Sequence, residues 1–199
     1  MIRLNVLTCV LVPVLYFGLQ AAFAQYYPGY SFWTTTASDL GDAASPVGRE
    51  FSAWVIGLGV VVTIAALTLP KRLAACDVPL WLALLPAIGL FSGALITFSA
   101  GIYPQPDPNH AGGAYGAGFI ALPMFMVLSH WRVAGSGLRF YLAANMFAFF
   151  AIAVVMADVL PHAAAMPPGF VQKLLALTLF VPPAVAALAL RPNLGTNGA

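Results

Sequence analysis

The chain has 199 residues, of which 61% are hydrophobic, with 8 Lys or Arg residues and 6 Asp or Glu residues. Charged residues therefore make up 7% of the chain, against about 25% in ordinary soluble domains, and they are too few to cover the surface of a soluble domain of this size. The high apolar content excludes a disordered chain, and a net charge of +2 without a basic cluster excludes a nucleic-acid-binding protein. The composition predicts an all-α, polytopic membrane protein.

Six apolar segments are long enough for transmembrane helices, which need about 20 mostly apolar residues. These segments are residues 4–24, 51–69, 78–100, 111–129, 140–159 and 170–190. Most connections are short, so neighbouring helices should pack antiparallel in one six-helix domain, residues 1–191. The tail at 192–199 contains Pro, Asn, Gly and Thr and is predicted to be disordered.

The first segment has a second interpretation, as a cleaved signal peptide, because Arg3 precedes an apolar run that ends in small residues at 22–24. The run is longer than the ~7–15 apolar residues of such a peptide. It is followed by Tyr26 and Tyr27, which are typical of a membrane interface. We favour a retained first helix, and cleavage, which would leave five spans, is the alternative.

The connection at 25–50 is the one long loop, and a compact protein rarely keeps such a loop without a use for it. We expect it to fold over the end of the bundle at the membrane surface, with a short helix over 34–40. Gly41 suits the position after that helix where a positive φ is needed. Ser45 and Pro46 are predicted to be the N-cap and first residue of the second span.

The basic residues predict the orientation, because cytoplasmic loops carry an excess of Lys and Arg. With both termini in the cytoplasm of a bacterial-type inner membrane, the bases on the inner side are Arg3, Lys71, Arg72, Arg132, Arg139 and Arg191. Only Arg49 and Lys173 then lie outside.

Small residues at four-residue spacing allow helices to pack closely in lipid. Such pairs are Gly89/Gly93 in the third span and Gly112/Gly116 and Ala114/Gly118 in the fourth. We expect them to pack helices within one bundle, and a homo-oligomer interface is the alternative.

No span is expected to carry an ionisable side chain at its middle, which argues against a proton pump or a carrier of charged substrates. Many of the ionisable side chains are expected at the outer boundary instead. The outer set is Asp39, Asp42, Arg49, Glu50, Asp107, His110, Asp158, His162 and Lys173. Its members would anchor the bundle, form an active site, or bind a lipid headgroup or an extracytoplasmic partner. We favour an outward-facing polar pocket with a binding or structural role.

The first alternative is a lipid-directed hydrolase in which Asp39, His110 and Asp158 serve as catalytic acids and bases. His110 and His162 are its candidate metal ligands, but their spacing matches no known zinc pattern, so no cofactor is assigned. The second alternative is a small-solute carrier with a binding site near Pro86, Pro123 or Asn145.

Two motifs resemble a bacterial and archaeal membrane family, domain of unknown function 998. They are Ser38-Asp39-Leu40-Gly41, followed by Ser45-Pro46 and Phe51, and Gly101-Ile102-Tyr103-Pro104, followed by His110. The resemblance implies a six-helix membrane protein of undefined activity, and it draws attention to Asp39 and His110. Gln105 stands where that family often has an acid. Asp39 also fits a loop-organising carboxylate that accepts backbone N–H bonds.

Overall fold

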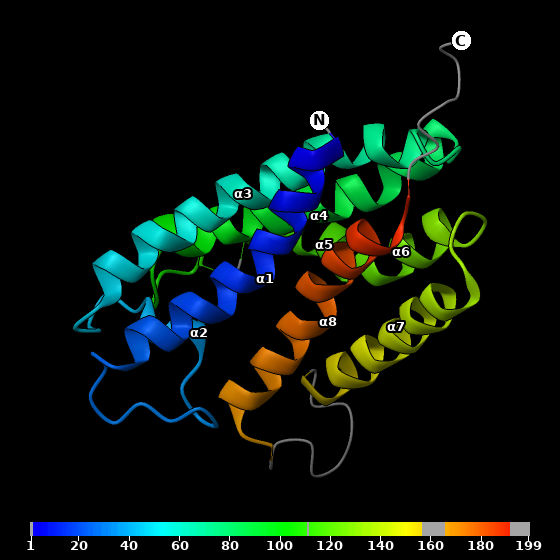
Figure 1. Cartoon of the computed structure of the whole chain (residues 1–199). Helices are drawn as coiled ribbons and strands as arrows, with labels where there is room; N and C mark the ends of the chain where they lie inside the picture. The colour runs from blue at the N-terminus through cyan, green and yellow to red at the C-terminus, as the bar shows by residue number, and fades with distance from the viewer. Residues whose placement is uncertain (1, 111, 157–165, 192–199) are drawn as a thin grey trace.

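The computed structural model describes residues 2–110, 112–156 and 166–191, and all regular structure within these ranges is helical (Figure 1). The elements are α1 (Ile2–Ala24), α2 (Ala37–Leu40), α3 (Gly48–Ala74), α4 (Leu80–Ile102), the 3₁₀ turn η1 (Gly113–Tyr115), α5 (Gly116–Ile120), α6 (Leu122–His130), α7 (Ser136–Met156) and α8 (Pro168–Ala189). Six helical stretches in this described part are long and apolar enough to cross a membrane. The all-α class and the predicted number of spans are confirmed.

The fourth span, predicted over 111–129, is broken into shorter helical pieces. It consists of η1, α5 and α6, with a turn at Ala121 between the last two. Pro123 is the second residue of α6 and has no amide hydrogen for the preceding turn, which accounts for a break at this place. Asp158, His162 and the tail at 192–199 lie outside the described residues.

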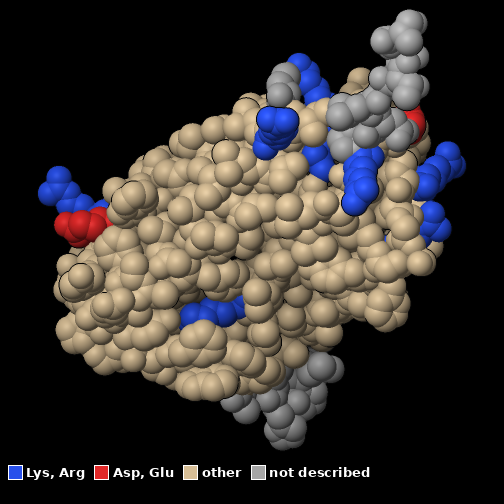
Figure 2. Space-filling view, in the orientation of Figure 1, with Lys and Arg blue, Asp and Glu red and all other residues tan. Residues whose placement is uncertain are grey.

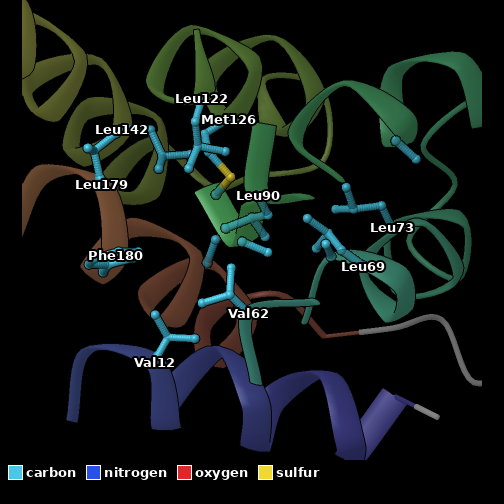
Figure 3. Close-up of a cluster of buried hydrophobic side chains, with 14 of the residues drawn as sticks. Val12, Val62, Leu69, Leu73, Leu90, Leu122, Met126, Leu142, Leu179 and Phe180 are labelled. Carbon is cyan, nitrogen blue, oxygen red and sulfur yellow. The ribbon is translucent and has the colours of Figure 1, made fainter. Parts of the chain in front are cut away.

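The helices form a bundle in which consecutive helices are neighbours (Figure 1). α3 packs along α4, α1 lies against α3 and α8, and α7 packs on α6 and α8. Side chains from these helices meet in an apolar core, part of which Figure 3 shows. Val62, Leu73, Leu90 and Leu122 are among its fully buried members.

Two amides join helices inside the bundle. Asn5, which is fully buried, donates from Nδ2 to the carbonyl oxygen of Ala65 at 3.1 Å and to Oγ1 of Thr68 at 3.0 Å, and so connects α1 to α3. Asn145 on α7 donates to the carbonyl oxygen of Thr178 on α8 at 2.9 Å. Such polar contacts between helices help to fix their register in an apolar surrounding.

The small residues of α4 and α5 pack against each other within the chain. A Cβ atom at Gly93 would lie 2.6 Å from the ring of Phe119, and one at Gly118 would lie 2.7 Å from Oγ of Ser92. A Cβ at Gly89 would also be crowded, because Leu122 would be 3.0 Å away. These glycines therefore permit close contact between helices of one bundle, as the first interpretation expected.

The charged residues separate to the two ends of the bundle, and Figure 2 shows basic side chains gathered where Figure 1 marks the N-terminus. We name this the N-terminal end and the opposite one the α2 end. The N-terminal end holds the bases at the start of α1, the end of α3, the loop before α7 and the end of α8. Arg72 is buried there and donates to the carbonyl oxygens of Ala187 and Leu190. α3, which carries it, ends at Ala74, beyond the predicted end of the second span at residue 69.

Candidate functional site

The α2 turn is held by reciprocal hydrogen bonds between its ends. The side chain of Thr36, the N-cap, accepts from the amide of Asp39 at 3.0 Å, and the carboxylate of Asp39 accepts from the amide of Thr36 at 2.7 Å. Asp39 therefore organises the loop by accepting a backbone N–H bond, the role that the sequence offered for it beside a catalytic one. Its contacts fix the backbone on both sides of Ser38.

Two predictions about the end of this loop are wrong. Gly41 follows α2 but has φ −88°, so no positive φ requires glycine here. Space is limited here instead, because a Cβ would lie 3.3 Å from the ring of Phe51, a tight contact. α3 begins at Gly48 with Val47 as N-cap, and Ser45 belongs to the turn before it. A Cβ at Gly48 would overlap the carbonyl oxygen of Asp42, so this tight turn delays the start of the helix.

Lys173 attaches the first loop to α8. The residue is only 4% exposed. Its ammonium group donates to the carbonyl oxygens of Phe32 at 3.1 Å, Thr35 at 2.8 Å and Gly169 at 3.2 Å. These three acceptors match the three donors of an ammonium group. The centre of the Phe32 ring lies 5.0 Å from the same nitrogen, close enough for a cation–π contact. Partial burial raises the pKa of the phenol of Tyr30, which is also near Lys173.

Gln172 makes a second attachment, directly beside Ser38. Its side-chain oxygen accepts from the amide of Ala37 at 2.6 Å. The amide of Phe170 donates to the carbonyl oxygen of Trp33 at 2.9 Å and adds a backbone link. The first turn of α8 thus sets the position of the α2 turn over the end of the bundle.

The second loop at this end, between α4 and η1, is held by its own turns. Asp107 accepts from the backbone amide of Asn109 at 2.8 Å, and Oγ of Ser99 donates to the carbonyl oxygen of Asn109 at 2.6 Å. The amide of Ala43 donates to the carbonyl oxygen of Gln105 at 3.0 Å and joins the two loops. His110 is therefore held at a fixed distance from the α2 turn.

Ser38 and His110 form a side-chain pair across these two loops. Oγ of Ser38 lies 2.9 Å from Nε2 of His110, and Nδ1 of His110 lies 2.9 Å from the carbonyl oxygen of Tyr103. A carbonyl oxygen only accepts hydrogen bonds, so Nδ1 must carry a proton. In the neutral imidazole Nε2 is then the acceptor, and the Ser38 hydroxyl donates to it.

A cavity of about 540 Å³ extends from this pair into the bundle. Its polar end, formed by Ser38, Gln105, His110 and Gln172, lies at the α2 end. The rest of the lining is mostly apolar: Tyr16, Leu19, Ala37, Gly41, Phe51, Ser52, Val55, Leu58, Ile96, Thr97, Ala100, Gly116, Phe119, Ile120, Phe149, Leu175, Ala176, Leu179 and Phe180. The hydroxyls of Ser52 and Thr97 donate to backbone oxygens of Gly41 and Gly93.

The cavity is elongated, partly open and uncharged. From Gln172 to Phe180 along α8 it spans roughly 12 Å, at 1.5 Å per residue, in a bilayer whose apolar core is about 30 Å thick. None of the described residues that line it is charged. Its volume lies within the range of about 300–1,000 Å³ that is usual for small-molecule sites.

The candidate residues Asp39 and His110 have different hydrogen-bond partners. His110 is bonded to Ser38 and Tyr103, whereas the Asp39 carboxylate is bonded to Thr36. No group of three His, Cys, Asp or Glu side chains within the described ranges is placed to hold a metal ion. The cavity lining does not include Pro86, Pro123 or Asn145, around which the carrier hypothesis was built. Ser38 was missed as a reactive group, although the sequence motif beginning with it was noted.

A second hollow, of about 530 Å³, lies at the N-terminal end between the α6–α7 loop and the end of α8. Cys76 and Arg191, the last described residue, contribute to its lining. Burial raises the pKa of the Cys76 thiol, and Cys9 and Cys76 are both buried and form no disulfide with each other. Buried neutral thiols of this kind behave as small apolar side chains.

The six apolar helices and the cavity indicate a multi-pass helical membrane protein with a partly open, mostly apolar cavity that is polar at one end. No family model, curated protein or solved structure matches the chain.

Proposed function

We propose that this protein binds an uncharged amphiphile, with an acyl chain in the cavity and a carbonyl-containing polar group beside Ser38, His110 and Gln172. The observation that carries the proposal is the cavity itself, which combines a mostly apolar lining with the side chains of Ser38, Gln105, His110 and Gln172 grouped at one end. That distribution matches a molecule with one long apolar part and one polar end.

The lack of charge on the described lining residues restricts the ligand further. A phosphate or ammonium group inside the cavity would lose its hydration without gaining an opposite charge, which is costly. An ester or amide carbonyl loses much less and accepts one hydrogen bond from each donor. Gln172 offers such a donor. Its side-chain oxygen already accepts a hydrogen bond from the amide of Ala37, and its side-chain NH₂ group can donate to the ligand.

We place the protein in a bacterial-type inner membrane, with the α2 end facing outward and both termini in the cytoplasm. The support is the gathering of Lys and Arg side chains at the N-terminal end of the bundle (Figure 2). The ligand would then come from the outer leaflet. The two motifs that resemble domain of unknown function 998 meet at the polar end, since Ser38 belongs to one and Tyr103 to the other.

The test uses a monoacylglycerol with a diazirine at the end of its acyl chain, added to the full-length protein in detergent micelles and activated by light. We expect cross-links at the deep end of the cavity, on peptides that contain Leu58 or Phe180. Unmodified monoolein should compete. Cross-links only on outward-facing side chains such as Phe140 and Phe147, which are 77% and 68% exposed, would refute the proposal.

Variants that fill the cavity give the matched comparison. Ala176 lines the cavity and is 5% exposed, so Ala176→Phe should lower the deep cross-links at least tenfold. Gly116→Leu is a second filling variant, because nothing lies within 4 Å of a Cβ at Gly116 and folding should be preserved. Ala22→Phe, at an exposed position of α1, is the control that should leave the cross-links unchanged. Equal cross-linking in all three folded variants would contradict the assignment to this cavity.

A further inference from the structure

The Ser38–His110 pair has the arrangement of a nucleophile and its general base. Nε2 of His110 is 2.9 Å from Oγ of Ser38, within the range over which a base removes a proton. The bond from Nδ1–H to the carbonyl oxygen of Tyr103, also 2.9 Å, fixes the tautomer that leaves Nε2 free to accept. A backbone carbonyl thus takes the orienting position that a carboxylate occupies in a Ser-His-Asp triad.

The surroundings of Ser38 hold it rigidly and leave its hydroxyl accessible. The capping bonds between Thr36 and Asp39 fix the turn on both sides of it, and Gln172 holds the amide of Ala37. Ser38 and His110 are both half-buried and both line the cavity. A carbonyl group at the polar end of the cavity would therefore lie next to the hydroxyl, with its acyl chain directed into the bundle.

We propose that Ser38 is the nucleophile and His110 the general base of an esterase or acyltransferase acting on the ester bond of an acyl lipid. The inference rests on the proposed function, since the acyl chain occupies the same cavity. It adds a covalent reaction to binding.

In the first step, Oγ of Ser38 forms a bond to the acyl carbonyl carbon and its proton passes to Nε2 of His110. The carbon–oxygen bond to the alcohol then breaks, and His110 returns the proton to the departing alcohol oxygen. The acyl group remains esterified to Ser38. Water, or an acceptor alcohol, attacks that ester while giving its proton to His110, and Ser38 regains a proton as the carboxylic acid or the new ester leaves.

The negative charge that develops on the carbonyl oxygen needs a hydrogen-bond donor. We assign this role to Gln172. Its side-chain oxygen accepts a hydrogen bond from the amide of Ala37, beside Ser38, and its side-chain NH₂ group can donate to the carbonyl oxygen. Gln105 lines the same end and offers a second side-chain amide. Both groups come from segments already fixed by backbone contacts, which is the condition for preorganised stabilisation.

The decisive experiment treats the full-length protein in micelles with a long-chain alkyl fluorophosphonate and locates the adduct by peptide mass spectrometry. The reagent forms a Ser–O–P bond and releases fluoride, so it reports an activated serine directly. We expect the adduct on Ser38. The labelling rate should fall about 10²-fold or more in His110→Gln, the usual effect of removing a general base.

Ser38→Ala should abolish the adduct. Ser45→Ala should not change it, because Oγ of Ser45 accepts a hydrogen bond from the amide of Val47 in the same loop and Ser45 is not among the described residues that line the cavity. Hydrolysis of 4-methylumbelliferyl oleate should follow the same order among the variants. An unlabelled Ser38 in the wild-type protein, or labelling that persists in His110→Gln, would overturn the inference.

Diazirine cross-linking and fluorophosphonate labelling of the same wild-type protein separate the two proposals. Deep cross-links in a wild-type protein whose Ser38 takes no fluorophosphonate would leave amphiphile binding standing and reject the reaction alone. Loss of deep cross-links from the wild-type protein rejects binding, and with it the inference that depends on it.

Discussion

The ammonium group of Lys173 lies 2.8 Å from the carbonyl oxygen of Thr35, a residue 138 positions earlier in the chain. This contact holds the part of the first loop just before α2 against the start of α8, and so controls where the α2 turn and Ser38 lie. The only base buried at the α2 end among the described residues thus serves a structural purpose.

Replacing Lys173 by Met should release the first loop. The stem is kept, but the carbonyl oxygens of Phe32, Thr35 and Gly169 lose their donor while remaining partly buried. We expect a loss of about 2–4 kcal/mol in the free energy of unfolding, measured by SDS titration in micelles. Arg49→Met, at an exposed base near the same end, should change it by less than about 0.5 kcal/mol. Equal stability of the two variants would contradict this role of Lys173.

The spans could be predicted from the sequence because their signal is local. A run of about 20 apolar residues needs a bilayer whatever its neighbours are. The ends of helices were less predictable, since they depend on distant contacts. α3 continues to Ala74 and carries Arg72 to the carbonyl oxygens at the end of α8, and a Cβ at Gly41 would crowd the ring of Phe51.

Half of the candidate site could be predicted. His110 was selected because it titrates and stands at the end of a span, and the structure places it at the cavity. Its partner Ser38 is 72 residues away and uncharged, so a search for ionisable groups passes over it. Asp39, its neighbour, attracted more attention, yet its carboxylate is used by the amide of Thr36. The cavity, which depends on how all the helices pack, has no local sequence signal.

Gly93→Ala should reduce the volume of the cavity, because the added methyl group would displace a side chain that lines it. The added Cβ would lie 2.6 Å from the ring of Phe119, which lines the cavity, so the ring must move or the helices must separate. We expect a loss of about 1–3 kcal/mol in the free energy of unfolding, the usual cost of overpacking. Weaker deep cross-linking by the diazirine monoacylglycerol should accompany it.

Gly57→Ala is the matched control for that substitution. Nothing lies within 4 Å of a Cβ at Gly57, which is inside α3, so the added methyl should raise stability by about 0.5–1 kcal/mol. The two Gly→Ala variants should therefore change the free energy of unfolding in opposite directions. The same sign for both would show that Gly93 is not limited by the ring of Phe119.

The contact between Asn5 and Thr68 should contribute modestly to the packing of α1. Asn5 donates to Thr68 at 3.0 Å, but its own side-chain oxygen is buried without a hydrogen-bond partner in the part of the chain that the structure describes. Asn5→Leu removes that unsatisfied acceptor as well as the two donated bonds. A double-mutant cycle with Thr68→Val should give a coupling of about 0.6 kcal/mol, the average for such bonds in membrane proteins. Zero coupling would indicate that the two side chains act independently.

Reporter fusions should establish which end of the bundle faces the cytoplasm. The N-terminal end holds the α3–α4 loop with Lys71 and Arg72 nearby, and cytoplasmic loops are enriched in such residues. Green fluorescent protein fused after Asp77 should fluoresce, and alkaline phosphatase at that site should be inactive. After Ala44, in the first loop, we expect phosphatase activity without fluorescence. The reverse pattern at both sites would turn the α2 end to the cytoplasm, and Ser38 would then meet amphiphiles of the inner leaflet.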